Sequence, residues 1–379
     1  MVKSCFTVIY TRLSTPMNSI LDILACLELD CIDGFKFKKE FGGKSSFSAL
    51  YENHEKKVVF KFLIFPRNNV ELERFNFEYQ ALYENIANRR ECEINDHPSL
   101  FMGPDSSYPL PKIVHNIKSI SEKIFYFSYE FEEGDLLSGV ENSKLVFSEK
   151  IELLYRLSSA MNYFGRTGYE HRDLHPENIL LKPNPCMQEF IINGPSNISA
   201  PENDPRIVFL DMGTCKIKKR SGELNRHFFI QNHNEDLIEN ENCKRVLSSF
   251  TSMPPDFLLK GRETKNYDSW ALGVYAYRLL FGRLPFEPES INDVYKILNS
   301  QWDISCYKEN LNSLPIALRL VLQHLLAFKG EERPPIYSIV RLFGWIKSDD
   351  HRFKSEGFIK RVIHNDGFDP DHNPIDDYY

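Results

Sequence analysis

The sequence has no long apolar run, no closely paired cysteines and no excess of positive charge. None of its hydrophobic stretches approaches the roughly 18–20 residues needed to span a bilayer, so we expect no membrane partner. Its eight cysteines include no C-x-x-C pair, which argues against zinc sites and disulfide frameworks and favours reduced thiols in the cytoplasm. The formal net charge of −7 argues against nucleic acid as a partner held mainly by charge.

The composition that is present is that of a globular protein, with 42% hydrophobic, 26% charged and 13% aromatic residues among 379. That length suits two ordinary domains or one two-lobed unit. The stretch 34–41 predicts a strand, and 49–65 predicts two strands joined by a polar turn. The segment from Val70 has helical spacing, and helices dominate from residue 137. The pattern predicts four parts: an N-terminal extension with a helix (1–34), a β-rich half (35–136), an α-rich half (137–347) and an acidic tail (348–379).

Polar side chains gather in HRDLHPEN, residues 171–178, directly before the apolar run ILL. Another carboxylate, Asp211, follows the apolar stretch RIVFL. If both apolar segments are short buried strands, Asp173, Asn178 and Asp211 could meet at their ends. Carboxylate and carboxamide oxygens suit Mg²⁺ better than zinc or copper, and Mg²⁺ commonly arrives with substrate phosphates. The pattern therefore indicates phosphoryl transfer.

These motifs resemble those of eukaryotic-type protein kinases. HRDLHPEN at 171–178 is similar to the catalytic-loop motif H-R-D-L-x-x-x-N, and DMG at 211–213 is similar to D-F-G with Met in place of Phe. VVFK contains Lys61 and FEYQAL contains Glu78. They stand where the family has the lysine of its third strand and the glutamate of the following helix.

Three downstream motifs extend the resemblance. MPPDF at 253–257 stands where the family has A-P-E, and YDSWALG at 267–273 resembles its D-x-W-x-x-G helix. Arg333 in ERPP stands where the family has an arginine that pairs with the A-P-E glutamate. The match covers roughly residues 35–345. It implies the α+β, bilobal protein kinase fold, with a β-rich N-lobe that carries one key helix and an α-rich C-lobe.

The resemblance implies a serine/threonine kinase that uses ATP and Mg²⁺ and phosphorylates protein substrates and itself. Lys61 would hold the α- and β-phosphates, Glu78 would orient Lys61, and Asp173 would steer the proton of the substrate hydroxyl. Asn178 and Asp211 would hold Mg²⁺. The other nucleotide contacts would come from the phosphate loop, the strand after it and the hinge: Gly42, Gly43, Ser45, Ser48, Leu50, Tyr129, Glu130 and Glu132.

The phosphate loop and the catalytic loop each depart from the family pattern. With Phe47 as the aromatic residue at the loop tip, only Gly43 of three glycines remains, and a shift by one would use Gly42. Serine does not adopt positive φ as freely as glycine, so we expect fewer backbone contacts to phosphate and looser nucleotide binding. His175 stands where serine/threonine kinases have a lysine that contacts the γ-phosphate, so activity should depend more on pH.

A third departure lies in MPPDF, where Asp256 replaces the glutamate of A-P-E. The side chain of Asp256 is one methylene shorter than that of glutamate. The ion pair with Arg333 that the resemblance implies would therefore need a closer approach of the two backbones, or a bridging water. The shorter side chain puts the geometry of this pair in question, and we expect one of these two arrangements.

Arg172, next to the expected catalytic aspartate, would bind a phosphate on the activation segment by family resemblance. The simpler alternative is that its guanidinium pairs with a nearby carboxylate. The segment between Asp211 and Asp256 is long for a loop, which favours a functional role. Its phosphorylation candidates are Thr214, Ser221, Ser248, Ser249, Thr251 and Ser252.

Two other functions stay open. The His175-Pro176 pair is also typical of aminoglycoside and choline phosphotransferases, which act on small alcohols. MPPDF, DSWALG and ERPP belong instead to the substrate platform of protein kinases and favour a protein substrate. A nucleotide-binding pseudokinase scaffold is the other alternative. An active enzyme is favoured because all five polar residues of the kinase pattern are present: Lys61, Glu78, Asp173, Asn178 and Asp211. Ser249 stands where serine/threonine kinases have a threonine, which favours that class over tyrosine kinases.

Overall fold

A computed structural model describes most of the chain, in two compact units. One unit, here the sheet unit, comprises Met1–Tyr79 and Pro111–Glu132; the other, the helical unit, comprises Gln80–Leu110 and Glu133–Tyr379. Each is considered by itself. The described residues are 29–42, 47–66, 69–95, 109–121, 124–140, 144–166, 169–182, 206–212, 216–217, 253–260, 264–287, 293, 296–297, 299, 305–348 and 356–364. The α+β fold class expected from the sequence is confirmed, whereas the helix expected in the N-terminal extension lies outside the described residues.

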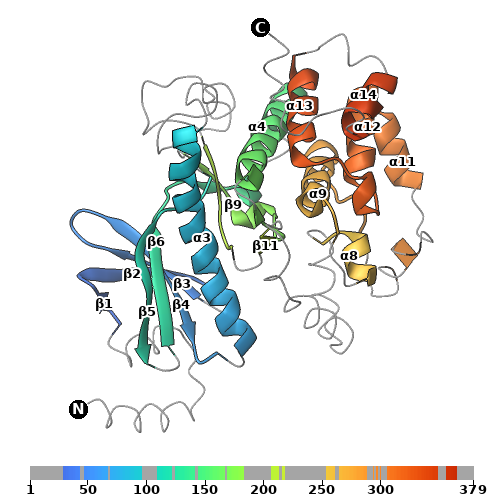
Figure 1. Cartoon of the computed structure of the whole chain (residues 1–379). Helices are drawn as coiled ribbons and strands as arrows, with labels where there is room; N and C mark the ends of the chain where they lie inside the picture. The colour runs from blue at the N-terminus through green and yellow to red at the C-terminus, as the bar shows by residue number, and fades with distance from the viewer. Residues whose placement is uncertain are drawn as a thin grey trace. The chain divides into compact units, whose positions relative to one another are not determined.

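Six antiparallel strands form the sheet unit, in the order β1-β2-β3-β4-β6-β5 (Figure 1). Asp33 and Gly34 join the first two strands with φ values of 50° and 83°, the left-handed conformation that two-residue hairpin turns require. The strands are β1 (Cys31–Ile32), β2 (Phe35–Gly42), β3 (Phe47–Glu52), β4 (Lys57–Ile64), β5 (Ile113–Ser121) and β6 (Ile124–Glu130).

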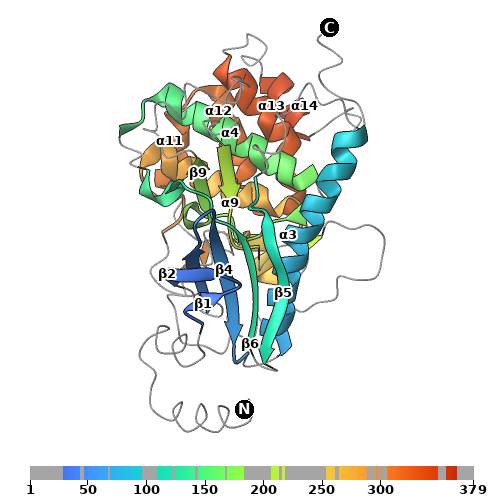
Figure 2. The same ribbon diagram turned by 90° about the vertical axis from the view of Figure 1, so that its left-hand side faces the viewer.

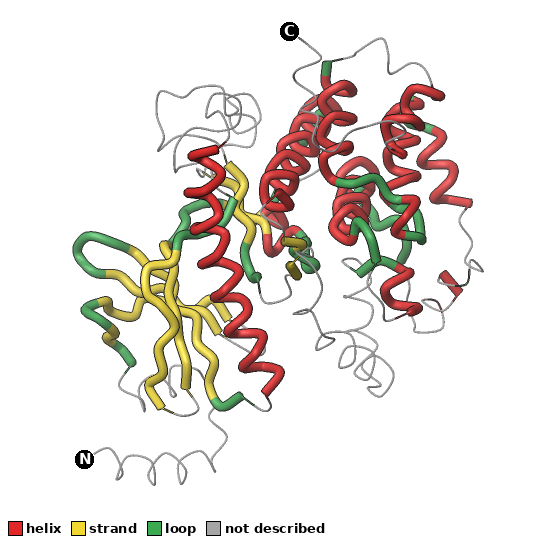
Figure 3. The backbone as a smooth tube through the Cα atoms, viewed as in Figure 1, coloured by secondary structure: helices red, strands yellow, loops and turns green. Residues whose placement is uncertain are grey.

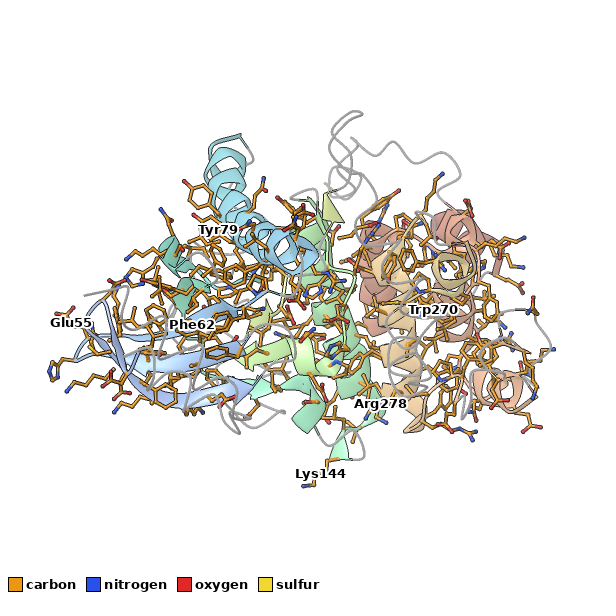
Figure 4. The ribbon with its side chains drawn as sticks, turned by 90° about the horizontal axis from the view of Figure 1, so that it is seen from below. Glu55, Phe62, Tyr79, Lys144, Trp270 and Arg278 are labelled. Carbon is orange, nitrogen blue, oxygen red and sulfur yellow. The ribbon has the colours of Figure 1, made fainter. Side chains whose placement is uncertain are left out.

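One face of this sheet is an aromatic core. Phe47 is only 5% exposed and stacks on Phe62 of the neighbouring strand at 4.8 Å between ring centroids. Phe62 lies among the packed side chains of the sheet (Figure 4). The expected position of Phe47 at the tip of the phosphate loop is therefore wrong, because a cross-strand aromatic partner holds it inside β3. The same cluster contains Leu29, Ile32, Phe35, Ala49, Tyr51, Val58, Phe60 and Tyr126.

Helix α3 (Asn69–Asn95) lies alongside β5 and β6 (Figure 2). Phe75 packs on Phe127 of β6 at 5.0 Å between ring centroids, and the Tyr79 hydroxyl donates to Asn116 Oδ1 of β5 at 2.9 Å. The helix continues through the polar stretch 88–95 and ends at Asn95. Arginine and glutamate are frequent in that stretch and are good helix formers, which outweighs its polarity.

The helical unit is built around α9, which is buried almost all round; helices prevail in it (Figure 3). Trp270, Leu272 and Val274 of α9 are at most 6% exposed, as expected for core residues, and Trp270 lies among the packed helices (Figure 4). The described helices of this unit are α4 (Phe147–Arg166), α8 (Pro255–Lys260), α9 (Tyr267–Phe281), α11 (Ser305–Asn312), α12 (Ile316–Leu325), α13 (Ile336–Lys347) and α14 (Glu356–His364).

The last described helix, α14, falls within the range expected to be an acidic tail. Ile359 and Ile363 of this helix are 0% and 1% exposed. An apolar residue repeated at a spacing of four marks one buried helix face. The helical unit therefore continues past residue 347. No helix among the described residues is long and apolar enough to cross a membrane.

Short strands in the helical unit carry the polar motifs. β9 (Ile179–Lys182) and β10 (Arg206–Phe209), the two short strands expected at the apolar runs after Asn178 and before Asp211, pair antiparallel. β7 (Asp135–Leu136) pairs with the other edge of β9. Gly134 precedes β7, and a Cβ there would overlap the carbonyl oxygen of Leu181. Only glycine allows this approach of the two backbones.

Candidate active site

A buried ion pair joins β4 to α3 in the sheet unit. Lys61 Nζ lies 2.6 Å from Glu78 Oε1, and the two residues are 6% and 4% exposed. The structure thus brings together the lysine and glutamate expected from the kinase resemblance. Burying two charges is costly, so such a pair is weak evidence for stability and better evidence for a functional role.

The expected nucleotide-binding residues of the sheet unit form two neighbouring rows. Gly42, Ser48 and Lys61 are paired across β2, β3 and β4. Leu50 and Tyr129 are both paired with Val59, one on each side of β4. The rows are two residues apart along β3 and β4, so their side chains share one face of the sheet. Gly43 and Ser45 lie outside the described residues.

The hinge residues follow directly from β6. Glu130 is the last residue of this strand, and its N–H donates to the carbonyl of Lys112 at 2.8 Å. The N–H of Phe131 donates to the carbonyl of Lys57 at 3.1 Å, and Glu132 comes next in the chain. These bonds anchor the start of the hinge to the sheet. The backbone beside Glu130 and Glu132 is thus tied to its neighbours on two sides.

In the helical unit, the buried imidazole of His171 supports the expected catalytic loop, residues 171–178. His171 is 0% exposed, and its Nε2 lies 3.0 Å from the carbonyl of Leu210. Since a carbonyl only accepts, Nε2 carries the proton and Nδ1 accepts the N–H of Asp173 at 3.3 Å. Burial lowers the pKa of His171, although nearby carboxylates oppose the shift. His171 is therefore a neutral structural group that fixes the position of Asp173.

Asp268, at the start of α9, supports the same loop. Its carboxylate accepts the backbone N–H groups of His171 and Arg172 at 2.8 and 2.9 Å. Arg172 has φ of 65°, a left-handed conformation that costs energy for a residue with a side chain. Two charge-assisted hydrogen bonds offset that cost. Sequence reasoning identified YDSWALG only as a family motif and missed this role, although its aspartate was the signal.

Asp173, Asn178 and His175 lie together on the loop. The Asn178 amide donates to the backbone carbonyl of Asp173 at 3.1 Å and to its Oδ2 at 3.4 Å. His175 Nε2 lies 3.7 Å from the same Oδ2. Burial lowers the pKa of His175, but the hydrogen bond and charge of Asp173 outweigh it and raise the pKa above its usual value. Asp173 therefore favours the protonated form of His175.

Asn178 and Asp211 lie at the same end of the β9–β10 pair. Phe209 pairs with Ile179, and the N–H of Leu210 donates to the carbonyl of Asn178 at 2.8 Å. Asp211 follows with φ of 57° and is exposed. A carboxamide and a carboxylate on adjacent strand ends offer the oxygen donors that Mg²⁺ prefers. The donor set therefore fits the ion that the kinase resemblance implies.

Arg172 is buried with unused hydrogen-bonding capacity. It is 8% exposed, and its Nη2 lies 3.5 Å from Glu170 Oε2. Its guanidinium also lies over the ring of Tyr267, at 5.1 Å from the centroid. Within the described part of the chain, Nε and Nη2 have no hydrogen-bond partner. Glu170 thus provides the nearby carboxylate of the simpler alternative, and N–H donors of Arg172 remain to bind an anion. The candidates Thr214, Ser248, Ser249 and Thr251 lie outside the described residues.

Asp256 and Arg333 form the second ion pair that the resemblance implies. Arg333 Nη2 lies 2.9 Å from Asp256 Oδ1, and the Arg333 side chain is 0% exposed. The shorter carboxylate therefore reaches the guanidinium directly, by close approach. Thr264 and Gly330 also contact this carboxylate. Sequence reasoning missed both, because no local pattern links them to Asp256.

Comparison with known sequences adds a family. A sequence model described as the protein kinase domain matches residues 106–342. Serine/threonine-protein kinase sgk-1 of Caenorhabditis elegans is 22% identical over 262 residues, which cover 68% of this chain and 45% of that protein. The ovarian-specific serine/threonine-protein kinase Lok of Drosophila melanogaster is 25% identical over 268 residues, which cover 69% of this chain and 47% of that protein. The chain thus spans about half the length of these curated relatives.

Proposed function

Because the chain belongs to the protein kinase family, we propose that it transfers the γ-phosphate of Mg-ATP to serine and threonine hydroxyls of protein substrates, and also phosphorylates itself. The observation that carries the proposal is the meeting of Asp173, Asn178 and Asp211 at one end of the β9–β10 pair. That arrangement supplies a carboxylate for the nucleophile and oxygen donors for a metal ion.

In this reaction a bond forms between the substrate hydroxyl oxygen and the γ-phosphorus, and the bond from that phosphorus to the bridging oxygen of ADP breaks. Asp173 orients the hydroxyl and takes up its proton. Lys61 binds the α- and β-phosphates, and Glu78 fixes the direction of Lys61. Asn178 and Asp211 would hold Mg²⁺, which neutralises phosphate charge when bound. The protein thus works by positioning and by charge.

His175 has a proposed role in the same step. Serine/threonine kinases place a lysine at this position of the catalytic loop. The raised pKa of His175 supports a positive charge in its place, 3.7 Å from Asp173 Oδ2. An imidazolium there would attract the γ-phosphate and hold the carboxylate in position. The charge would be lost at higher pH, unlike that of a lysine.

Protein substrates are favoured over small alcohols. Both relatives described above are named serine/threonine-protein kinases. The pairing of Asp256 with Arg333 also supports a protein substrate platform, since MPPDF and ERPP are the motifs that separate protein kinases from small-molecule phosphotransferases. We propose that Arg172 binds phosphate on the activation segment, supported by its buried Nε and Nη2, which have no hydrogen-bond partner among the described residues.

The test is incubation of the purified protein with labelled ATP, Mg²⁺ and a cell lysate, alongside Asp173→Asn. We expect the parent to label itself and lysate proteins, and the variant to lose this labelling by about a thousandfold or more. Melting temperatures of both proteins should agree within about a degree, since Asn178 can still bond the backbone of residue 173. Equal labelling would overturn the proposal. Binding of Mg-ATP without labelling by the parent would favour the scaffold alternative.

A further inference from the structure

In the helical unit, three residues converge on the largely buried carboxylate of Asp256: Thr264, Gly330 and Arg333. We call these residues together with Asp256 the Asp256 network. Asp256 lies in α8, Thr264 comes shortly before α9, and Gly330 begins the 3₁₀ turn η5 (Gly330–Glu332). Arg333 follows that turn. Their contacts decide how α8 and the start of α9 are fixed.

Both oxygens of Asp256 are used. Oδ1 accepts from Arg333 Nη2 at 2.9 Å, and Oδ2 accepts from the N–H of Gly330 at 2.9 Å. The Thr264 hydroxyl donates to the same Oδ2 and accepts from Arg333 Nη2 at 2.7 Å. This hydroxyl therefore stands between the carboxylate and the guanidinium. It links the two charges by a second route beside their direct contact.

The charged side chains of this network are largely buried, so the loss of any one contact is expected to lower stability. The Arg333 side chain is 0% exposed and that of Asp256 is 12% exposed. Burial lowers the pKa of Arg333, and the charge of Asp256 opposes that shift. Arg333 Nη1 donates to the carbonyl of Ala327 at 3.0 Å. Loss of one partner in such a site leaves a buried charge without compensation.

Close packing at Gly330 shows that the space around Thr264 is full. A Cβ at Gly330 would overlap the Thr264 hydroxyl and would lie 2.6 Å from the carbonyl oxygen of Lys265. A longer side chain at Asp256 would also have to enter the space that the hydroxyl occupies. The short carboxylate, the hydroxyl and the bare glycine are therefore matched to one another.

The network is tied to the catalytic loop through the start of α9. The Asn266 amide donates to the carbonyl of Arg333 at 2.7 Å, and the Ser269 hydroxyl donates to the carbonyl of Pro334 at 2.8 Å. Between these two residues, Asp268 accepts the N–H groups of His171 and Arg172. A shift of residues 264–269 would therefore move the support of the catalytic loop.

We propose that Thr264 is a positioning residue whose hydroxyl takes the place of the methylene that Asp256 lacks, and thereby holds α8, η5 and the start of α9 in register with the catalytic loop. Its effect on catalysis rests on the proposed kinase function. Its effect on the position of the loop does not.

The first test compares Thr264→Val, which keeps the shape and removes the hydroxyl, with Thr264→Ser, which keeps the hydroxyl. We expect Thr264→Val to lower Tm by roughly 3–6 °C and kcat for a protein substrate about tenfold. KM for ATP should stay within about twofold, since Thr264 is not expected to touch nucleotide. Thr264→Ser should restore Tm and kcat. Ser348→Ala is the matched control, because Ser348 is exposed and its hydroxyl donates to the local carbonyl of Trp345.

The second test asks whether Thr264 and Asp256 replace one longer side chain. Asp256→Glu and Thr264→Ala should each lower Tm, because the first crowds the hydroxyl and the second leaves the short carboxylate without it. The double variant should recover most of the loss, since the longer carboxylate then has both the length and the room. Additive losses in the double variant would overturn the proposal, because the two positions would then act independently.

Amide hydrogen exchange provides a measure that does not depend on phosphate transfer. In Thr264→Val we expect the N–H groups of His171 and Arg172 to exchange about tenfold faster, because their acceptor Asp268 is less well held. Unchanged exchange together with unchanged kcat would overturn the positioning role, even if Tm falls. If the parent transfers no phosphate at all, the proposed function fails, and the Tm cycle and exchange rates still decide the role of Thr264.

Discussion

The sheet unit and the helical unit each contain a buried ion pair, and the two pairs are built differently. Lys61 and Glu78 meet at 2.6 Å between a strand and a helix, and both side chains are those that the kinase pattern requires. Asp256 of α8 and Arg333, which follows η5, meet at 2.9 Å, and one side chain is a methylene short. The carboxylate of this second pair also contacts the hydroxyl of Thr264 and the backbone N–H of Gly330.

The difference indicates which of the two ion pairs tolerates a change in side-chain length. If Lys61 binds phosphate, as proposed, it has to keep the reach of its side chain, and its partner on α3 is then fixed by function. A pair that holds two elements together needs only a filled and satisfied site, and neighbours can supply the missing atoms. Substitutions in the first pair should therefore affect catalysis, whereas those in the second should affect stability first.

The largest expected effect is that of Arg333→Met. It leaves the Asp256 carboxylate without its main partner in a site withdrawn from water, so we expect a loss of about 3–5 kcal/mol in the free energy of unfolding. Urea denaturation measures this loss. Arg278→Met is the control, because Arg278 is exposed on α9 (Figure 4). A loss below about 1 kcal/mol would show that the helical unit does not depend on this pair.

The next largest effect is expected for the Lys61–Glu78 pair. Lys61→Met should lower kcat/KM for phosphate transfer by at least about a hundredfold, because it removes the charge expected to hold the phosphates. Lys56→Met, on an exposed lysine of the β3–β4 turn, should leave kcat/KM unchanged. Retention of kcat/KM in Lys61→Met, measured over a series of Mg-ATP concentrations, would remove the functional distinction between the two ion pairs.

A smaller effect is expected from the pH dependence of His175. Its pKa is raised, so the imidazolium is present at lower pH and is lost as pH rises through that raised value. We expect kcat to fall several-fold over this range in the parent, whereas His175→Lys should stay flat because a lysine keeps its charge to about pH 10. Equal pH profiles of the two proteins, measured in one buffer series, would contradict a catalytic role of the imidazolium.

The smallest expected effect concerns the aromatic face of the sheet. Phe47→Leu should cost about 1 kcal/mol in the free energy of unfolding, because it weakens the stack on Phe62 inside β3. KM for ATP should stay unchanged. A higher KM with unchanged stability would instead place Phe47 in the phosphate loop and would reverse the assignment of this residue to the core.

Features set by local pattern could be predicted from the sequence. The strands around Asn178 and Asp211 followed from two short apolar runs, and the Lys61–Glu78 pair followed from the resemblance to the protein kinase motifs. Phe47 was misplaced because a single aromatic residue fits a loop tip and a cross-strand stack equally well in sequence. The stack became visible only when β3 and β4 were paired.

The residues that escaped prediction act across long distances in the chain. Thr264 and Gly330 meet at the carboxylate of Asp256 only after α8, α9 and η5 have packed. Neither residue type is unusual on its own, and neither carries a motif. The burial of α14 had a local signal in Ile359 and Ile363, but the acidic residues after His364 dominated the reading of that region.

The central claim is that this chain is an active kinase for serine and threonine hydroxyls of proteins. Phosphoamino-acid analysis of the products labelled by the purified parent from ATP and Mg²⁺ tests it most directly. The account predicts phosphoserine and phosphothreonine in protein, and their loss in Asp173→Asn. Phosphotyrosine alone, label confined to a small alcohol, or labelling that persists in Asp173→Asn would contradict it.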